Sequence, residues 1–319
     1  MSAVLARGAA HPSAGVALVL LMGACFATMD TSVKAAGEVL PVLVILSARY
    51  GVQAGVMGLW LAITRRRAGG AAFRAAHPRF QLARGLLLLI SSAFGFFGLQ
   101  YLPVAEFTAI AMLTPVLVTL LSAWLLHERV SPLRWLLIAG GFGGALIVIR
   151  PGSGLFGWAV LLPLASAVAY ASFQVLTRKL SALENPYTTH FYTGLTGIVV
   201  VAALLLASPI DLAPSLGEAA PLYLGLLLLV GLLGTAGHLM LVLAFGLAPT
   251  ATLMPFIYAQ IGFAALISWL VFRAAPDGWG WLGMTVIAIC GAMTAWLNVR
   301  EATRQHEPVS VLTADSSAD

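Results

Sequence analysis

Ten apolar segments of bilayer-spanning length follow one another along this 319-residue chain. A transmembrane helix needs about 20 predominantly apolar residues, and 60% of the chain is hydrophobic whereas only 9% is charged. Such a chain cannot cover a soluble globule with polar surface, so the sequence predicts an all-α integral membrane protein with ten transmembrane helices. The helices are expected at residues 14–36, 41–64, 82–101, 103–126, 132–149, 155–178, 187–208, 221–245, 248–272 and 277–298.

The ten segments divide into two sets of five that match each other at offsets of 145 to 147 residues. The first set covers residues 14–150 and the second 155–298, and a cytoplasmic, disordered tail is expected at 299–319. Because five is odd, the second set must enter the bilayer from the opposite side. Two inverted five-helix repeats are typical of secondary transporters, in which the substrate site lies between the repeats near mid-membrane. The matching positions are Pro41 and Pro186, residues 102–105 and 248–251, Trp135 and Trp281, and Gly144 and Gly291.

The basic residues gather on one side of the predicted membrane. With the N-terminus in the cytoplasm, 13 of the 17 Lys and Arg residues are cytoplasmic, three lie outside and Arg49 lies within a helix. The positive-inside rule therefore predicts that both termini are cytoplasmic, and the net charge of +5 does not indicate nucleic-acid binding. The cytoplasmic set is Arg7, Arg65, Arg66, Arg67, Arg74, Arg79, Arg84, Arg129, Arg134, Arg178, Lys179, Arg300 and Arg304.

Arg49 is the most unusual of the charged residues. An ionisable group at the bilayer centre costs about 2.5–3.5 kcal/mol, so it needs a partner or a function. Arg49 follows Pro41 by eight residues, about 12 Å along a helix axis, and its guanidinium stays protonated. It is expected either to face the central cavity or to form a buried structural pair, and Asp30 and Glu106 are the acids at compatible depth.

Further ionisable residues lie near the predicted outer surface. Asp30, Lys34 and Glu38 are spaced four residues apart and share one helix face. They form either an interfacial salt bridge or part of the outer mouth of a substrate cavity. Glu106, near the start of the predicted fourth helix, is either a partner of the helix dipole or a protonatable group that couples transport to a proton gradient.

The polar residues of the second repeat are neutral. His238, near mid-membrane, serves either in hydrogen-bonded packing or as a proton relay. Tyr258 and Gln260 follow Pro249 and Pro255, and proline frees backbone carbonyls that can bind a ligand. Tyr170 is a further polar residue of this repeat. The candidate substrate-binding or coupling residues are Asp30, Lys34, Arg49, Glu106, Gln174, Tyr192, His238, Tyr258 and Gln260.

Small residues indicate where helices approach each other closely. Gly140 and Gly144 form a GxxxG pair in the fifth segment, and Gly283 and Gly291 lie two turns apart in the tenth. Without a hydrophobic driving force in lipid, such residues allow close packing. They serve either packing within the chain or a homodimer interface.

Enzyme motifs are missing from the sequence. There is no G-x-x-x-x-G-K-[ST] motif, and His127-Glu128 begins an H-E-x-x-H motif that lacks its second histidine. We therefore expect no ATP-driven transport, no enzyme activity, no metal and no cofactor.

Each repeat carries a recurring pattern of prolines, glycines and charges. It comprises residues 102–106, 114–115, 125–130 and 140–152 in the first repeat, and 248–249, 255–260 and 276–277 in the second. This pattern resembles the EamA domain of the drug/metabolite transporter superfamily, although Ala274 stands where the family often carries a glutamate. The resemblance covers residues 14–298 and implies ten helices in two inverted repeats and alternating access without ATP. The stretch 29–34 resembles a subgroup that includes riboflavin and S-adenosylmethionine carriers.

These features predict a bacterial inner-membrane carrier, proton-coupled or exchanging, for a small polar or amphipathic metabolite such as riboflavin, S-adenosylmethionine or an amino acid. Arg49 would orient a ligand group, with Asp30 or Glu106 as its counter-charge or proton site. The expected partners are the substrate, the lipid bilayer and, as one alternative, a second copy of the chain. A non-transporting receptor or assembly factor is the first rival function, and a membrane-embedded enzyme is the second.

Overall fold

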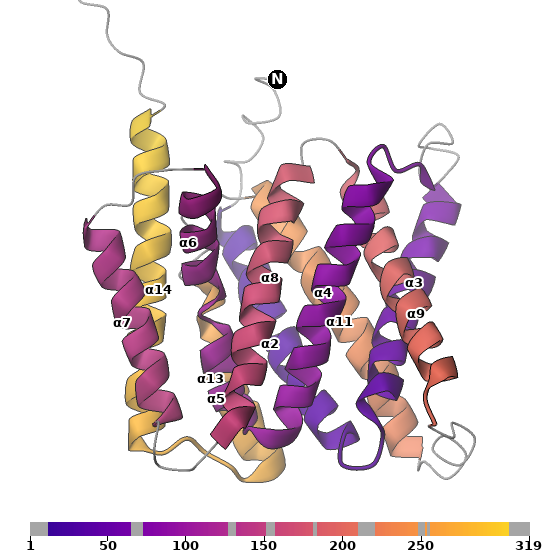
Figure 1. The fold of residues 1–319 in the computed structure, drawn as a ribbon, viewed down its shortest axis with the longest axis horizontal. Coiled ribbons are helices and arrows are strands. Elements are labelled where there is room, and N and C mark those ends of the chain that lie inside the picture. The colour runs from indigo at the N-terminus through magenta and orange to yellow at the C-terminus, as the bar shows by residue number, and fades with distance from the viewer. Residues whose placement is uncertain are drawn as a thin grey trace, which may run out of the picture.

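The computed structural model describes residues 12–64, 73–126, 132–150, 157–180, 184–209, 221–247, 253 and 256–305. Within these ranges the chain is built from helices that stand side by side (Figure 1). Residues 65–67, Glu128, the junction 151–154, Pro249, Pro255 and the tail beyond 305 lie outside the described residues. The helices are α2 (Pro12–Ala36), α3 (Val42–Thr64), α4 (Pro78–Tyr101), α5 (Val104–Ala111), α6 (Thr114–Leu126), α7 (Pro132–Ile149), the 3₁₀ turn η3 (Gly157–Val160), α8 (Leu161–Leu180), α9 (Pro186–Ala207), α11 (Pro221–Leu247), α13 (Ala259–Phe272) and α14 (Gly278–Gln305).

The helical content and the apolar helices agree with the predicted all-α membrane protein. Among the described residues, six helical segments are long and apolar enough to cross a membrane, and four further apolar helices are shorter. Each of the ten predicted segments contains at least one of these helices. Within the ninth segment α13 spans Ala259–Phe272, and most of 248–258 lies outside the described residues.

The predicted fourth segment, 103–126, forms two helices instead of one. α5 ends at Ala111 and α6 begins at Thr114, because Pro115 has no N–H and its ring would clash with the carbonyl of Ala111. The hydroxyl of Thr114 donates a hydrogen bond to that carbonyl at 2.7 Å. The break therefore leaves the Ala111 carbonyl with a donor.

Two helix ends also differ from the prediction. α4 begins at Pro78 rather than at 82, since proline is favoured in the first turn of a helix. This earlier start places Arg84 in the second turn of α4. At the other end of the chain, α14 continues to Gln305, beyond its expected end at 298, through residues with good helix propensity.

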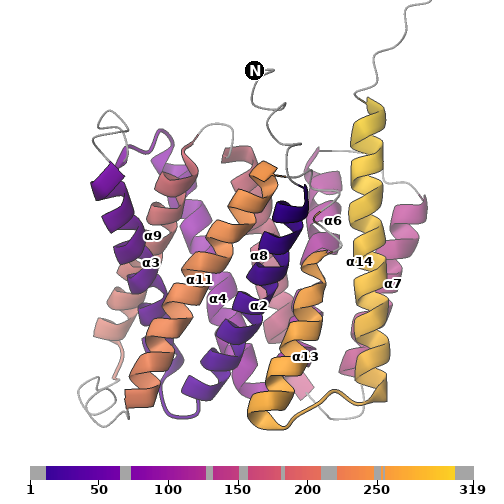
Figure 2. The same ribbon diagram turned by 180° about the vertical axis from the view of Figure 1, so that it is seen from behind.

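The helices pack in a recurring pattern that joins the two halves of the chain. α2 packs on α11 and α13, α8 packs on α4, α5 and α6, and α3 packs on α9 and α11. α7 packs on α14, at the edge of the molecule opposite α3 and α9, as both views show (Figures 1 and 2). The first residues of α2 and the last residues of α14 lie at the same end of the bundle (Figure 2).

Backbone contact at glycines holds α7 against α14. A Cβ atom at Gly144 would lie 2.9 Å from the carbonyl oxygen of Gly283, and one at Gly283 would lie 2.6 Å from the carbonyl oxygen of Gly144. A Cβ atom at Gly140 would meet the sulfur of Cys290 at 2.6 Å. These glycines thus pack within the chain, as one of the two predicted alternatives requires. We call this contact of Gly140 and Gly144 with Gly283 and Cys290 the glycine seam.

The glycine seam predicts a position-specific effect of alanine. Gly144→Ala should lower stability by about 1–3 kcal/mol, the usual cost of overpacking a tight interior. Gly143→Ala is the matched control, because a Cβ atom at Gly143 meets nothing within 4 Å, and alanine should be neutral or slightly stabilising there. Thermal unfolding in detergent compares the two variants, and equal melting temperatures would contradict the seam.

Candidate functional site

Arg49 lies in the interior of the bundle without full hydrogen bonding. It belongs to α3 and is 2% exposed. Its Nε and Nη1 atoms have no hydrogen-bond partner among the described residues, while its guanidinium lies 4.7 Å from the ring centroid of Tyr50. On α11, a Cβ atom at Gly234 would lie 3.4 Å from Arg49 Nε, so this glycine leaves room for the side chain. Two buried N–H donors are therefore available to a ligand.

Asp30 of α2 is the acidic residue whose charge interacts with that of Arg49. It is buried and interacts electrostatically with Arg49, but no ion pair within 4 Å joins the two among the described residues. The charge of Arg49 is thus balanced only at longer range. Asp30 is therefore available as a counter-charge that does not occupy the donors of Arg49.

Two buried histidines from the second half of the chain lie beside this pair. His238 of α11 places Nδ1 2.8 Å from the carbonyl oxygen of Gly234. His190 of α9 lies with its ring centroid 6.0 Å from that of His238. Gln53 of α3 donates to the carbonyl oxygen of His190 at 3.1 Å. Arg49 interacts electrostatically with both histidines, so α3, α9 and α11 together build one polar cluster.

Aromatic rings surround the polar cluster. The ring of Phe26 on α2 meets His238 edge-on at a centroid distance of 4.9 Å. Tyr170 of α8 lies 6.3 Å from His238 and stacks on Phe173 at 5.6 Å. We call Phe26, Arg49, Tyr170, His190 and His238 the central cluster. Its residues come from α2, α3, α8, α9 and α11, and thus from both halves of the chain.

Arg84 is a second buried arginine, and its Nε and Nη1 atoms both have hydrogen-bond partners. Its Nε atom donates to the hydroxyl of Thr177 at 2.7 Å, and its Nη1 atom donates to the Thr193 hydroxyl at 2.6 Å and to the Thr189 carbonyl at 3.1 Å. Its guanidinium lies 4.6 Å from the ring centroid of Phe173. The predicted cytoplasmic side of Arg84 stays a prediction, and the structure adds that its side chain is buried in the bundle. Arg84 thereby joins α4 to α8 and α9.

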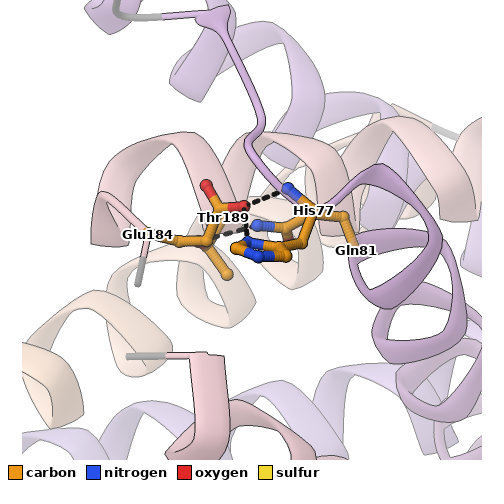
Figure 3. Close-up of polar contacts among 4 residues, drawn as sticks. All are labelled: His77, Gln81, Glu184 and Thr189. Carbon is orange, nitrogen blue, oxygen red and sulfur yellow. Dashed lines mark hydrogen bonds and ion pairs between the residues drawn. The ribbon is translucent and has the colours of Figure 1, made fainter. Parts of the chain in front are cut away.

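The same ends of α4 and α9 are joined by a second polar group, shown in Figure 3. The backbone N–H of His77 donates to Glu184 Oε1 at 2.7 Å, and the His77 ring nitrogen Nδ1 lies 3.5 Å from the same oxygen. Gln81 donates to the hydroxyl of Thr189 at 3.1 Å. The Glu184 side chain is only 3% exposed. These hydrogen bonds link the two halves of the chain at one end of the bundle.

At the opposite end of the bundle, Lys34 binds backbone rather than a carboxylate. Its Nζ atom donates to the carbonyl oxygens of Leu99 and Leu102 at 2.7 and 3.0 Å. A cation is favoured at this position because the last carbonyls of α4 lack helical partners. Among the described residues no ion pair within 4 Å joins Lys34 to Asp30 or Glu38, although the charge of Glu38 acts on Lys34. The two predicted alternatives for this group stay predictions.

Glu106 lies apart from the central cluster. It occupies the first turn of α5, where the helix dipole favours a carboxylate, and interacts electrostatically with Asp277, Arg150 and Lys34. The expectation that Glu106 partners Arg49 is not met among these interactions. Arg150 Nη1 pairs with Asp277 at 2.6 Å. A hydrogen bond from the Gly280 N–H and the charge of Arg150 hold the pKa of Asp277 below its ordinary value.

The remaining predicted site residues lie outside the central cluster. The Tyr192 hydroxyl donates to the carbonyl oxygen of Phe73 at 2.8 Å. Tyr258 packs its hydroxyl against Gly291 of α14, and the backbone of Gln260 faces Gly23 of α2. Gln174 is half-buried on α8.

Some residues at the central cluster, or at the contacts of α4 with α8 and α9, were not among the predicted site residues. They include Gln53, His190, Arg84 and Glu184. Gln53 and His190 could have been found by the rule used for Arg49, because both are polar residues within apolar segments. Among the described residues, no three His, Cys, Asp or Glu side chains lie close enough together to hold a metal ion.

Comparison with known proteins is consistent with this arrangement. A riboflavin transporter of Rhizobium johnstonii is 33% identical over 247 residues, which cover 76% of this chain and 78% of the relative. An S-adenosylmethionine uptake transporter of Rickettsia felis is 24% identical over 73% of this chain and 77% of its own length. A solved crystal structure covers 92% of this chain and 99% of its own with a TM-score of 0.62 and 19% identity, so it shares the fold.

One family model matches the chain twice. The model of the EamA-like transporter family matches residues 13–150 and again residues 157–296. The predicted resemblance is thereby confirmed, including its link to riboflavin and S-adenosylmethionine carriers. The chain therefore belongs to the EamA-like transporter family.

Proposed function

We propose that this chain is an ATP-independent carrier that moves a riboflavin-like metabolite across the bacterial inner membrane by alternating access. The observation that carries the proposal is Arg49, a buried cation with two unpartnered donors. Polar groups of this kind inside a membrane protein mark a ligand pathway. The relatives named as riboflavin and S-adenosylmethionine transporters support a metabolite substrate.

The packing pattern supports two inverted repeats, 14–150 and 155–298. The first helix of each half packs on the third helix of the other half, as α2 on α11 and α8 on α4. The second helices, α3 and α9, pack on each other, and so do the fifth, α7 and α14. A two-fold axis in the membrane plane produces this exchange of partners. With the bias of Lys and Arg along the sequence, the proposal places both termini in the cytoplasm.

Alternating access requires the halves to separate at one end at a time. The polar contacts between the halves at one end can be broken at modest cost. Hydrogen bonds of Arg84 to Thr177 and Thr193, and of His77 to Glu184, join the halves at one end. Hydrogen bonds that are exchanged for water on opening have a modest net cost, about 0.5–1.5 kcal/mol each. In the proposed cycle this end is closed in the state described, and opening releases these bonds.

Charge favours a flavin over a sulfonium compound as the substrate. Among the charged residues that are wholly buried in the described part of the chain, two are cations, Arg49 and Arg84, and one is a carboxylate, Asp30. A permanent cation such as the sulfonium of S-adenosylmethionine would be repelled in this field. A neutral planar ring with carbonyl oxygens would accept hydrogen bonds from Arg49 and stack against Phe26 and Tyr170.

The proposal gives the polar residues specific roles. Asp30 serves as counter-charge or proton site for Arg49. Glu106 serves as helix-dipole partner or protonatable coupling group, at the opposite end of the bundle from the His77–Glu184 contact. We include no enzyme activity, cofactor or metal. A homodimer remains part of the proposal as an alternative assembly, with an interface other than the glycine seam.

Counterflow in proteoliposomes tests the function. Vesicles that contain the purified chain and unlabelled riboflavin should accumulate external labelled riboflavin without ATP, whereas protein-free vesicles should not. S-Adenosylmethionine should compete poorly. Binding of riboflavin without counterflow would instead indicate the receptor alternative, and absence of both binding and flux would refute the proposed substrate.

A further inference from the structure

His238 presents a hydrogen-bond acceptor that no described residue uses. Its Nδ1 atom contacts the carbonyl oxygen of Gly234 at 2.8 Å, and since a carbonyl can only accept, Nδ1 carries the proton. In the neutral ring, Nε2 then has a lone pair. This Nε2 atom is buried without a hydrogen-bond partner among the described residues. Buried polar atoms are normally paired, so the ring is held in place with its acceptor ready for a ligand.

The donors of Arg49 reach the same turn of α11. Gly234 orients His238 through its carbonyl, and a Cβ atom at the same glycine would lie 3.4 Å from Arg49 Nε. Nε and Nη1 of Arg49 are unpartnered, like His238 Nε2. The donors of Arg49 and the acceptor of His238, from opposite halves of the chain, therefore both lie beside the Gly234 turn of α11, and the charge of Arg49 acts on His238.

Aromatic side chains limit the shape of a ligand here. Phe26 and Tyr170 both contact the His238 ring edge-on, at centroid distances of 4.9 and 6.3 Å. Flat rings pack well against such surfaces. The complement of one acceptor beside donors, between aromatic rings, is a flat heterocycle whose ring N–H adjoins a carbonyl group.

We propose that His238 Nε2 accepts the N–H of a cyclic imide while Arg49 donates to the carbonyl oxygen beside it. The inference rests on the proposed function, since the pyrimidinedione edge of a flavin is such an imide. Adenine also sets an amino donor beside a ring-nitrogen acceptor, so the choice of the imide over adenine rests on the buried cations that disfavour a sulfonium compound. His238 is thus a specificity-determining residue for the imide edge.

Methylation of the imide nitrogen tests this assignment in the unchanged protein. Riboflavin and 3-methylriboflavin are compared as competitors of labelled riboflavin uptake into proteoliposomes. We expect the methylated compound to compete at least about tenfold more weakly, because it has lost the donor and carries a methyl group where Nε2 lies. Equal competition by the two compounds would overturn the proposal.

Two variants separate the hydrogen bond from the bulk of the methyl group. His238→Phe keeps an aromatic ring but removes the acceptor, so riboflavin should lose its advantage and the ratio of the two compounds should approach one. His238→Gln restores a carbonyl acceptor and should recover part of the preference. A preference unchanged in His238→Phe would overturn the role of His238.

The experiments distinguish failure of the proposed substrate from failure of the role assigned to His238. If the unchanged protein shows no riboflavin flux, the proposed function fails, and this inference fails with it. If riboflavin is transported without discrimination against its methylated form, only the inference fails. Should His238→Phe not fold, the comparison in the unchanged protein and in His238→Gln still decides. A preference that is reduced but retained in His238→Gln would support the role, and equal competition by the two compounds in the unchanged protein would refute it.

Discussion

Arg49→Gln is expected to abolish transport while leaving the melting temperature unchanged or raised. Transport should fall at least about a hundredfold, because two donors and the charge that would hold the ligand are lost. Stability should not fall, because Nε and Nη1 are buried without partners in the described structure, and each unsatisfied buried group costs about 1–3 kcal/mol. Residues that bind ligands commonly trade stability for function in this way.

Flux and stability are measured on the same preparation, by counterflow in proteoliposomes and by thermal unfolding in detergent. Arg49→Lys is the informative control, since it keeps the charge but loses the planar donor arrangement, and it should recover little flux. Normal flux in Arg49→Gln would remove Arg49 from the site. A lower melting temperature together with lost flux would make Arg49 a structural residue instead.

Arg84→Gln is expected to have the opposite effect on stability. Arg84 is also buried, but it donates three hydrogen bonds to Thr177, Thr189 and Thr193. Its removal leaves buried hydroxyl and carbonyl groups without their charged donor, and hydrogen bonds to charged groups contribute about 1.5–3 kcal/mol each. We expect a loss of about 3 kcal/mol and an apparent melting temperature lower by several degrees.

Arg79→Gln is the matched control for Arg84, because Arg79 lies on the same helix and is exposed. Substitution of an exposed residue should change stability by no more than about 0.5 kcal/mol. Thermal unfolding of both variants in one detergent measures the difference. If Arg84→Gln were as stable as Arg79→Gln, the hydrogen bonds between α4 and its neighbours would not hold the bundle together.

The backbone architecture is the part of this molecule that the sequence predicts well. Apolar length determines where helices form, and the glycines of α7 and α14 predict a close packing that the structure places within the chain. Pro103 separates α4 from α5 as expected. The extra break before Pro115 was missed, although the same physical rule applies there, because the surrounding residues are mostly apolar.

Partners of polar side chains were predicted less well, because they depend on which helices become neighbours. Lys34 has acids at helical spacing on its own helix, yet its ammonium binds carbonyls at the end of α4. Arg84 lies within the predicted third segment, but its partners Thr177 and Thr193 follow only from the packing of α4 on α8 and α9. His190 lies 48 residues before His238 in the sequence, and only the packing of α9 near α11 brings the two rings to 6.0 Å.

The glycine seam also determines where a covalent crosslink can be introduced between the two halves. A Cβ atom at position 140 would lie 3.9 Å from the Cβ atom of Cys290, within the range of about 3.5–4.5 Å found in disulfides. Cys290 is a free thiol in this structure. A single Gly140→Cys substitution therefore supplies the second thiol, and oxidant or reductant would then fasten or release the last helix of one half against that of the other.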